Sequence, residues 1–167
     1  MPMDAECRPA LVVGLGNPLL GDDGVGWQVA EHVRREAGPA VEVDCLAVGG
    51  LRLMERLVGC HQAIIIDALA TGRQPPGAIN VFSAADLFGL AAGYSTSVHD
   101  MTLAAALRLG QTLALPLPET LWIIGIEVVP TFDFTETLTP PIAAAVPQAA
   151  RLVLELLRQP VEEGQMI

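Results

Sequence analysis

Cysteine is scarce in this sequence, and the few cysteines show no pairing pattern. The 167 residues include three cysteines, Cys7, Cys45 and Cys60, with no C-x-x-C spacing. An odd number without close pairs argues against a disulfide framework and against a structural zinc site. We therefore predict reduced thiols, which are typical of a cytoplasmic protein.

Basic residues are also few. Nine Lys and Arg stand against 19 Asp and Glu, so the net charge is −10 and the pI is near 4.5. Phosphate backbones are bound by clustered basic side chains, and here the only adjacent pair is Arg34-Arg35. This composition predicts no nucleic-acid partner, while docking onto a basic patch of another protein stays open.

Long apolar runs are missing as well. No run approaches the roughly 20 residues of a membrane-spanning helix, so we predict no membrane span. The N-terminus carries Asp4 and Glu6 where a secretory signal would carry Lys or Arg, and no apolar stretch follows them. Both observations favour a cytoplasmic location.

Apolar residues are nevertheless abundant, at 51% of the chain, and they fall in alternating segments of two kinds. Short apolar or alternating runs predict strands, and longer segments with apolar residues on one stripe predict helices. We expect strands at 10–15, 41–46, 63–66, 79–82 (an edge strand) and 121–126, and helices at 24–37, 50–58, 99–113 and 140–158. Residues 91–97 and 129–138 are predicted as loops, the first of them mobile. This alternation predicts a single domain over residues 1–167, a three-layer α/β/α sandwich with a mostly parallel sheet.

Three side chains fall where such a sheet carries its functional site, beyond the carboxyl ends of its strands. Asp23 follows the first strand, Asp67 ends the third, and His99 lies at the start of the helix predicted from residue 99. All three are expected on loops, outside the core. Two carboxylates and an imidazole together suit a borderline divalent cation such as nickel.

Each of these residues could also have a purely structural role. Asp22 and Asp23 would favour the N-terminus of the next helix, and we expect Asp22 to cap it. Asp67 would bond to a turn, and a single histidine before a helix is commonly structural. A dinucleotide site at Gly14 and Gly16 is rejected, because Leu19 occupies the third glycine position of G-x-G-x-x-G.

The order of motifs along the chain resembles the maturation proteases of nickel–iron hydrogenases. The matching segments run from Gly14-Leu15-Gly16-Asn17 and Asp22-Asp23-Gly24-Val25-Gly26 through Ile66-Asp67-Ala68, Pro76-Gly77 and Val98-His99-Asp100 to Ile124-Gly125-Ile126 and Leu138-Thr139-Pro140. The resemblance implies a phosphorylase/hydrolase-like α/β/α fold and an endopeptidase activity.

The resemblance also implies a substrate and a site. The enzyme would remove the C-terminal tail of a hydrogenase large-subunit precursor after nickel insertion, with Asp23, Asp67 and His99 as nickel ligands and catalytic residues. The nickel would be contributed by the precursor, so the ligands discriminate loaded from empty substrate. Either an aspartate acting as general base or polarisation by the metal would activate the attacking water.

Two alternatives remain from the sequence. A non-cleaving nickel-binding protein that checks hydrogenase assembly would use the same three ligands. Peptidyl-tRNA hydrolases also begin with a strand and Gly-Leu-Gly-Asn-Pro, but Gly21 to Gly24 stand where their catalytic histidine would be expected. The acidic composition disfavours a tRNA substrate further.

Overall fold

The computed structural model describes residues 9–47, 49–91, 98–130 and 133–159, without the side chains of 88–91 and 98–102. The strands are β1 (Ala10–Leu15), β2 (Val41–Leu46), β3 (Gln62–Leu69), β4 (Ile79–Ser83) and β5 (Thr120–Glu127). The helices are α1 (Val25–Glu36), α2 (Leu51–Leu57), α3 (Ala84–Ala91), α4 (Val98–Thr112) and α5 (Pro140–Arg158), and a 3-10 turn, η1 (Gly21–Gly24), precedes α1.

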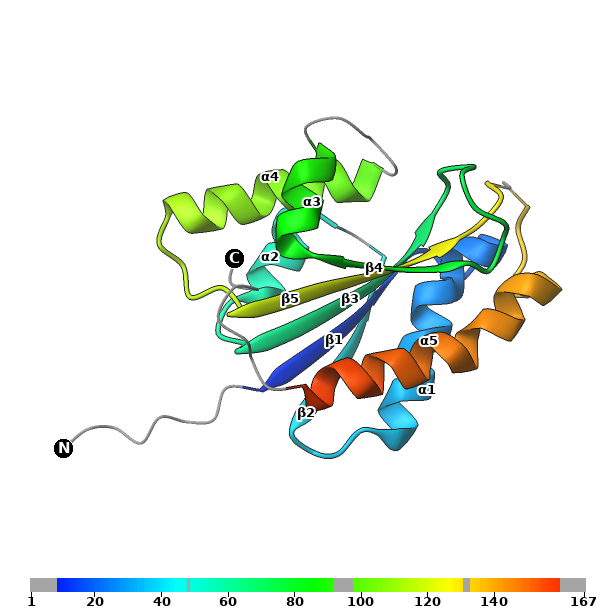
Figure 1. Ribbon diagram of the computed structural model, residues 1–167, viewed down its shortest axis with the longest axis horizontal. Coiled ribbons are helices and arrows are strands. Elements are labelled where there is room, and N and C mark those ends of the chain that lie inside the picture. The colour runs from blue at the N-terminus through cyan, green and yellow to red at the C-terminus, as the bar shows by residue number, and fades with distance from the viewer. Residues whose placement is uncertain (1–8, 48, 92–97, 131–132, 160–167) are drawn as a thin grey trace.

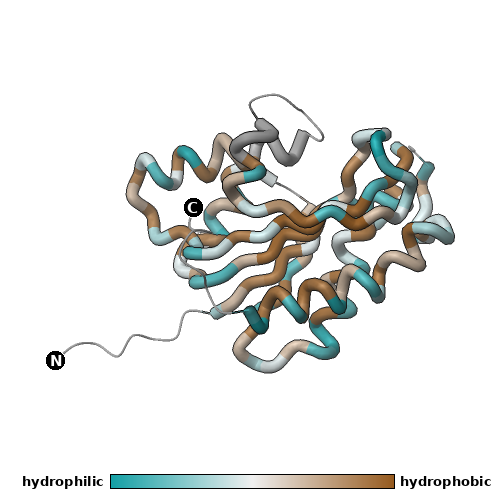
Figure 2. The backbone as a smooth tube through the Cα atoms, viewed as in Figure 1, coloured by the Kyte–Doolittle hydropathy of each residue, from teal (hydrophilic) through white to brown (hydrophobic). Residues whose placement is uncertain are grey.

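The five strands form one sheet in the order β2-β1-β3-β5-β4. All neighbouring pairs are parallel except β4 with β5, which is antiparallel and leaves β4 at one edge. The central strands β1 and β3 are buried along their full lengths, which explains why they are almost continuously apolar. In Figure 2 these strands are the brown centre of the molecule.

Helices cover both faces of the sheet, as Figure 1 shows. Even-numbered residues of the central strands, such as Val12 and Ile64, pack with α1 and α5. Odd-numbered residues, such as Leu11 and Ile65, pack with α2, α3 and α4. This division follows from the alternation of side chains along a strand, and it confirms the predicted three-layer sandwich.

Helix α3 was not predicted from the sequence, although its first turn carries a readable signal. The backbone N–H of Ser83 donates to Oδ2 of Asp86 at 2.8 Å, and the N–H of Asp86 donates to Oγ of Ser83 at 3.2 Å. This reciprocal pair is a capping box, and its hydrogen bonds from the backbone and hydroxyl of Ser83 lower the pKa of Asp86. Of the predicted loop at 91–97, Ala91 ends α3 and residues 92–97 lie outside the described part.

The other predicted elements are confirmed with small shifts in their ends. β3 and β5 are longer than expected and continue to Leu69 and Glu127, so they carry the sheet past the predicted strand ends. α5 begins at Pro140 after Thr139, as predicted. No helix in the described ranges is long and apolar enough to cross a membrane.

Candidate functional site

Asp23 folds back over the carboxyl end of β1 because Gly16 leaves room for it. Gly16 has a φ of +120°, and a Cβ there would lie 1.9 Å from the backbone oxygen of Asp23. The backbone N–H of Asn17 donates to Oδ2 of Asp23 at 2.7 Å. The half-buried Asp23 carboxylate is therefore held at the carboxyl end of the sheet.

A second close approach seats the turn carrying Asp23 against the neighbouring strand. A Cβ on Gly26 would lie 2.3 Å from the carbonyl oxygen of Leu15 and 2.5 Å from that of Ile66. The first turn of α1 thus rests on the ends of both β1 and β3, and η1 contacts β3. Since Ile66 directly precedes Asp67, Asp23 and Asp67 reach the same carboxyl end of the sheet from the adjacent strands β1 and β3.

Asp67 lies deeper than the sequence pattern predicts. It is inside β3, two residues before the end of the strand, and only 2% of it is exposed. The prediction that it lies on a loop outside the core is therefore wrong, because β3 continues beside β5 beyond this point. Its Oδ1 accepts the N–H of Ala68 at 2.9 Å, and by strand alternation its side chain is on the α4 face, like that of Ile65.

His99 was predicted where a loop leads into a helix, and it lies in the first turn of α4, which begins one residue earlier, at Val98. α4 covers the same face of the sheet as the side chain of Asp67. The side chain of His99 lies outside the described residues. Where side chains are described, no three His, Cys, Asp or Glu come together as a metal site. The predicted trio, which includes His99, therefore stays a prediction.

Asp22 has a different structural role from the predicted one. Its Oδ1 accepts the N–H of Thr139 at 2.7 Å, and its Oδ2 accepts the Thr139 hydroxyl at 2.8 Å. The residue before α1 is Gly24, which makes no side-chain cap, so the prediction that Asp22 caps this helix is wrong. Asp22 instead ties the Asp23 turn to the start of α5, which lies 117 residues away in sequence.

We expect Asp22→Ala to lower the free energy of unfolding by about 1–3 kcal/mol, since it removes two hydrogen bonds from a carboxylate that is only 5% exposed. Urea unfolding measures this loss. Asp133→Ala, at an exposed aspartate, is the matched control and should change stability by less than about 0.5 kcal/mol. Combining Asp22→Ala with Thr139→Ala should give clearly less than the sum of the single losses; full additivity would contradict the contact.

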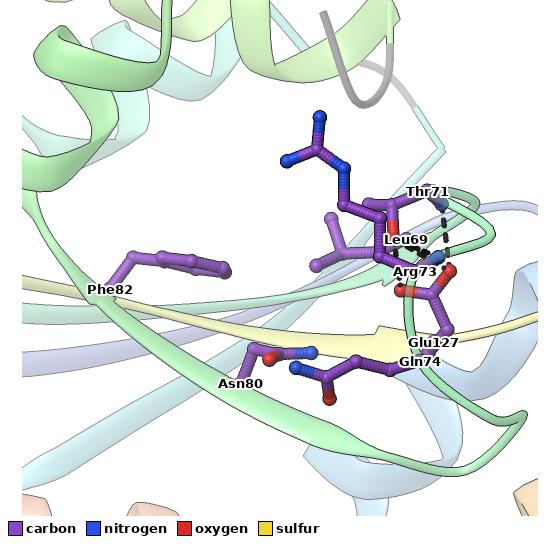
Figure 3. A pocket seen from close by; sticks show the side chains of 7 residues that line it. All are labelled: Leu69, Thr71, Arg73, Gln74, Asn80, Phe82 and Glu127. Atoms are coloured by element: carbon purple, nitrogen blue, oxygen red, sulfur yellow. Dashed lines mark hydrogen bonds between the residues drawn. The ribbon is translucent and has the colours of Figure 1, made fainter. Parts of the chain in front are cut away.

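Glu127, a buried acid at the end of β5, was not predicted from the sequence. It is 2% exposed, and its carboxylate accepts the N–H of Thr71 at 2.8 Å, the N–H of Gly72 at 2.7 Å and the Thr71 hydroxyl at 2.8 Å. These bonds fix the loop that follows β3 (Figure 3). Glu127 directly follows an apolar run, as Asp67 does, and this position in the sequence is the signal that could have identified it.

Glu127 also lines a cavity of about 160 Å³. The other lining residues are Leu69, Thr71, Arg73, Gln74, Asn80 and Phe82, which come from β3, β4 and the loop between them. In Figure 3 the ring of Phe82 points toward Leu69, and the guanidinium of Arg73 points away from Glu127. The cavity therefore has apolar walls, with polar groups from the loop and from β4.

Comparisons with known proteins agree on one family. The sequence model of the family described as hydrogenase maturation protease matches residues 27–156, a range that includes Asp67 and His99 and begins after Asp23. The hydrogenase expression/formation protein HupD of Thiocapsa roseopersicina is 28% identical over 151 residues, which are 89% of this chain and 67% of HupD.

Two solved structures share the fold. The hydrogenase maturating endopeptidase HybD from E. coli matches with a TM-score of 0.75 at 26% identity, over 90% of this chain and 92% of its own. The [NiFe] hydrogenase maturation protease HybD from Thermococcus kodakarensis matches with a TM-score of 0.70 at 25% identity, over 89% and 98% of the two chains.

Proposed function

This chain belongs to the hydrogenase maturation protease family, and from that premise we propose that it cuts the C-terminal tail from the large-subunit precursor of a nickel–iron hydrogenase after nickel insertion. It is a peptidase, as the family description and the neighbours named as endopeptidases state. The observation that carries the proposal is that Asp23 and Asp67 lie at the same carboxyl end of the sheet, where the close backbone contacts of Gly16 and Gly26 hold the Asp23 turn. Backbone N–H groups already hold both carboxylates, that of Asn17 at Asp23 and that of Ala68 at Asp67, so the two acids are fixed in place for a ligand.

In this proposal the two aspartates and His99 recognise nickel that the precursor already holds. Carboxylate oxygen and imidazole nitrogen are suitable donors for that metal. Ligands that engage only the loaded precursor would bring its scissile peptide to the site and leave the empty precursor uncut. The fixed Asp23 turn and the strand position of Asp67 support such discrimination, because rigid donors select by geometry.

Two groups can activate the water that attacks the peptide. A carboxylate of Asp23 or Asp67 would accept its proton as general base, or the precursor's nickel would polarise the scissile region. Replacing nickel in the precursor with another divalent metal separates these routes. A rate that changes little with the metal favours the carboxylate, and a rate that follows the metal favours polarisation.

The direct test is mass spectrometry of large-subunit precursors incubated with this protein, with and without nickel loading. We expect loss of one discrete C-terminal peptide, and only from the loaded form. Loss of the peptide from both forms would refute the nickel dependence. Intact precursors in both arms, across every large subunit of the host, would favour the alternative of a nickel-binding protein that checks assembly without cutting.

We also propose a cytoplasmic location for this reaction. Cys45 and Cys60 are free thiols, and burial raises the pKa of both. Protonated thiols of this kind are stable in a reducing compartment and suit a cytoplasmic enzyme.

A further inference from the structure

A row of three residues crosses the sheet at the level of Asp67. Asp67 on β3 pairs with Gly125 on β5, and Gly125 pairs with Asn80 on β4. Residues that pair across strands share a face, so all three face the same side as Phe82, which packs against the core on the α2, α3 and α4 face. Two strand spacings of about 4.8 Å place Asn80 roughly 10 Å from Asp67.

Gly125, in the middle of this row, has no side chain and so leaves room for a neighbour. The side chain of Leu69, two residues after Asp67, leans over Gly125, so that a Cβ there would lie 2.1 Å from Cδ1 of Leu69. Leu69 and Phe82 are the apolar walls of the 160 Å³ cavity, so the Leu69 side chain lies between the level of Asp67 and the cavity beside β4.

The loop that lines one side of the cavity is held in place by Glu127. Glu127 accepts hydrogen bonds from Thr71 and Gly72, which hold the loop that carries Arg73 and Gln74. The carboxamides of Gln74 and Asn80, which also line the cavity, point toward one another (Figure 3). A site fixed in this way loses little entropy when a ligand enters.

The volume limits the ligand. Cofactor and drug-sized ligands occupy pockets of about 300–1,000 Å³, so this cavity is too small for a nucleotide. An apolar cavity of about 150 Å³ holds a molecule the size of benzene, which is the size of one side chain. The carboxamides of Gln74 and Asn80 match the backbone N–H and C=O groups that flank such a side chain in an extended peptide.

We propose that the cavity is a substrate subsite that binds one apolar side chain of the precursor's tail, about three residues beyond the bond that is cut. This assignment rests on the proposed function, in which the metal-binding end of the precursor lies at Asp67. An extended chain advances about 3.3 Å per residue, so the roughly 10 Å that two strand spacings put between Asp67 and Asn80 corresponds to about three residues. The carboxamides of Asn80 and Gln74 bind the backbone of the tail, and Leu69 and Phe82 enclose its side chain.

The test measures cleavage of precursors in which each of the first five tail residues is changed in turn to Ala, Leu or Trp. For the wild type we expect one position, about the third, at which Leu is preferred and Ala and Trp each raise KM by about tenfold or more. Phe82→Ala enlarges the cavity and should reverse the order of Leu and Trp at that position alone.

Val81→Ala is the matched control, because Val81 is the neighbour of Phe82 on β4 and is 39% exposed. It should leave the preference unchanged. If Phe82→Ala does not fold, Asn80→Leu serves instead, since it removes a polar lining group and should weaken the preference for Leu at the same position. Cleavage without any position that responds to these variants would overturn the subsite while leaving the proposed function intact. An absence of cleavage by the wild type would overturn both.

Discussion

Asp67→Asn is expected to lower the rate of tail removal by about 100-fold or more while the protein stays folded. The amide has the shape of the carboxylate and keeps an oxygen for the N–H of Ala68, so packing inside β3 is preserved. What it loses is the negative charge, which the proposed site needs to bind nickel or to accept a proton. Mass spectrometry of the precursor over time measures the rate, and thermal unfolding reports the fold.

Asparagine is preferable to alanine here because of the burial of Asp67. At 2% exposure, truncation to Ala would leave a cavity in the strand and mix a loss of stability with a loss of function. Asp44→Asn is the matched control. It makes the same chemical change on β2, where Asp44 pairs with Arg56 away from the proposed site, and it should keep full activity.

Asp23→Asn and His99→Ala should show the same loss of processing as Asp67→Asn. Asp23 and Asp67 reach the same carboxyl end of the sheet, and His99 lies in the first turn of α4, which covers the face of Asp67. Retained activity in all three variants would remove the site assignment. A loss confined to one variant would reduce the site to that residue.

The sandwich could be predicted well from the sequence because its central strands are evident from composition alone. β1 and β3 are fully buried, and a short, continuous apolar run between turns is typical of a strand covered on both faces. α3 was missed because it is only eight residues long, so its periodicity is short and its Ser83-Asp86 capping box was the main signal. The ends of β3 and β5 are set by the pairing of these two strands, which are distant in sequence. A local sequence pattern therefore could not predict where they end.

The site was predicted in part for a related reason. The rule that loops meet at the carboxyl ends of parallel strands was sufficient to select Asp23 and Asp67. It did not separate the roles of two adjacent aspartates, because the partner of Asp22 is Thr139, at the far end of the chain. Glu127 was missed for the same reason, since its partners Thr71 and Gly72 follow a different strand.

Gly26→Ala is the second variant with a large expected effect. The added Cβ would lie 2.3 Å from the carbonyl oxygen of Leu15 and 2.5 Å from that of Ile66, well inside the 3.0 Å that real Cβ atoms keep. Both neighbours are backbone atoms in central strands, so they cannot turn aside as a side chain would. The first turn of α1 must move, and the adjoining turn with Asp23 moves with it, away from Asp67.

We therefore expect Gly26→Ala to lower the free energy of unfolding by roughly 3 kcal/mol, at the upper end of the usual range for overpacking, and to abolish processing. In a helix, alanine is more favourable than glycine by about 1 kcal/mol. Helix propensity alone would therefore stabilise the variant, so any net loss of stability must come from the clash. Gly38→Ala is the matched control, because a Cβ there meets nothing within 4 Å. Urea unfolding of the two variants compares the same chemical change with and without the contact. Equal stability and equal activity would mean that the close approach of α1 to β1 and β3 does not position the site.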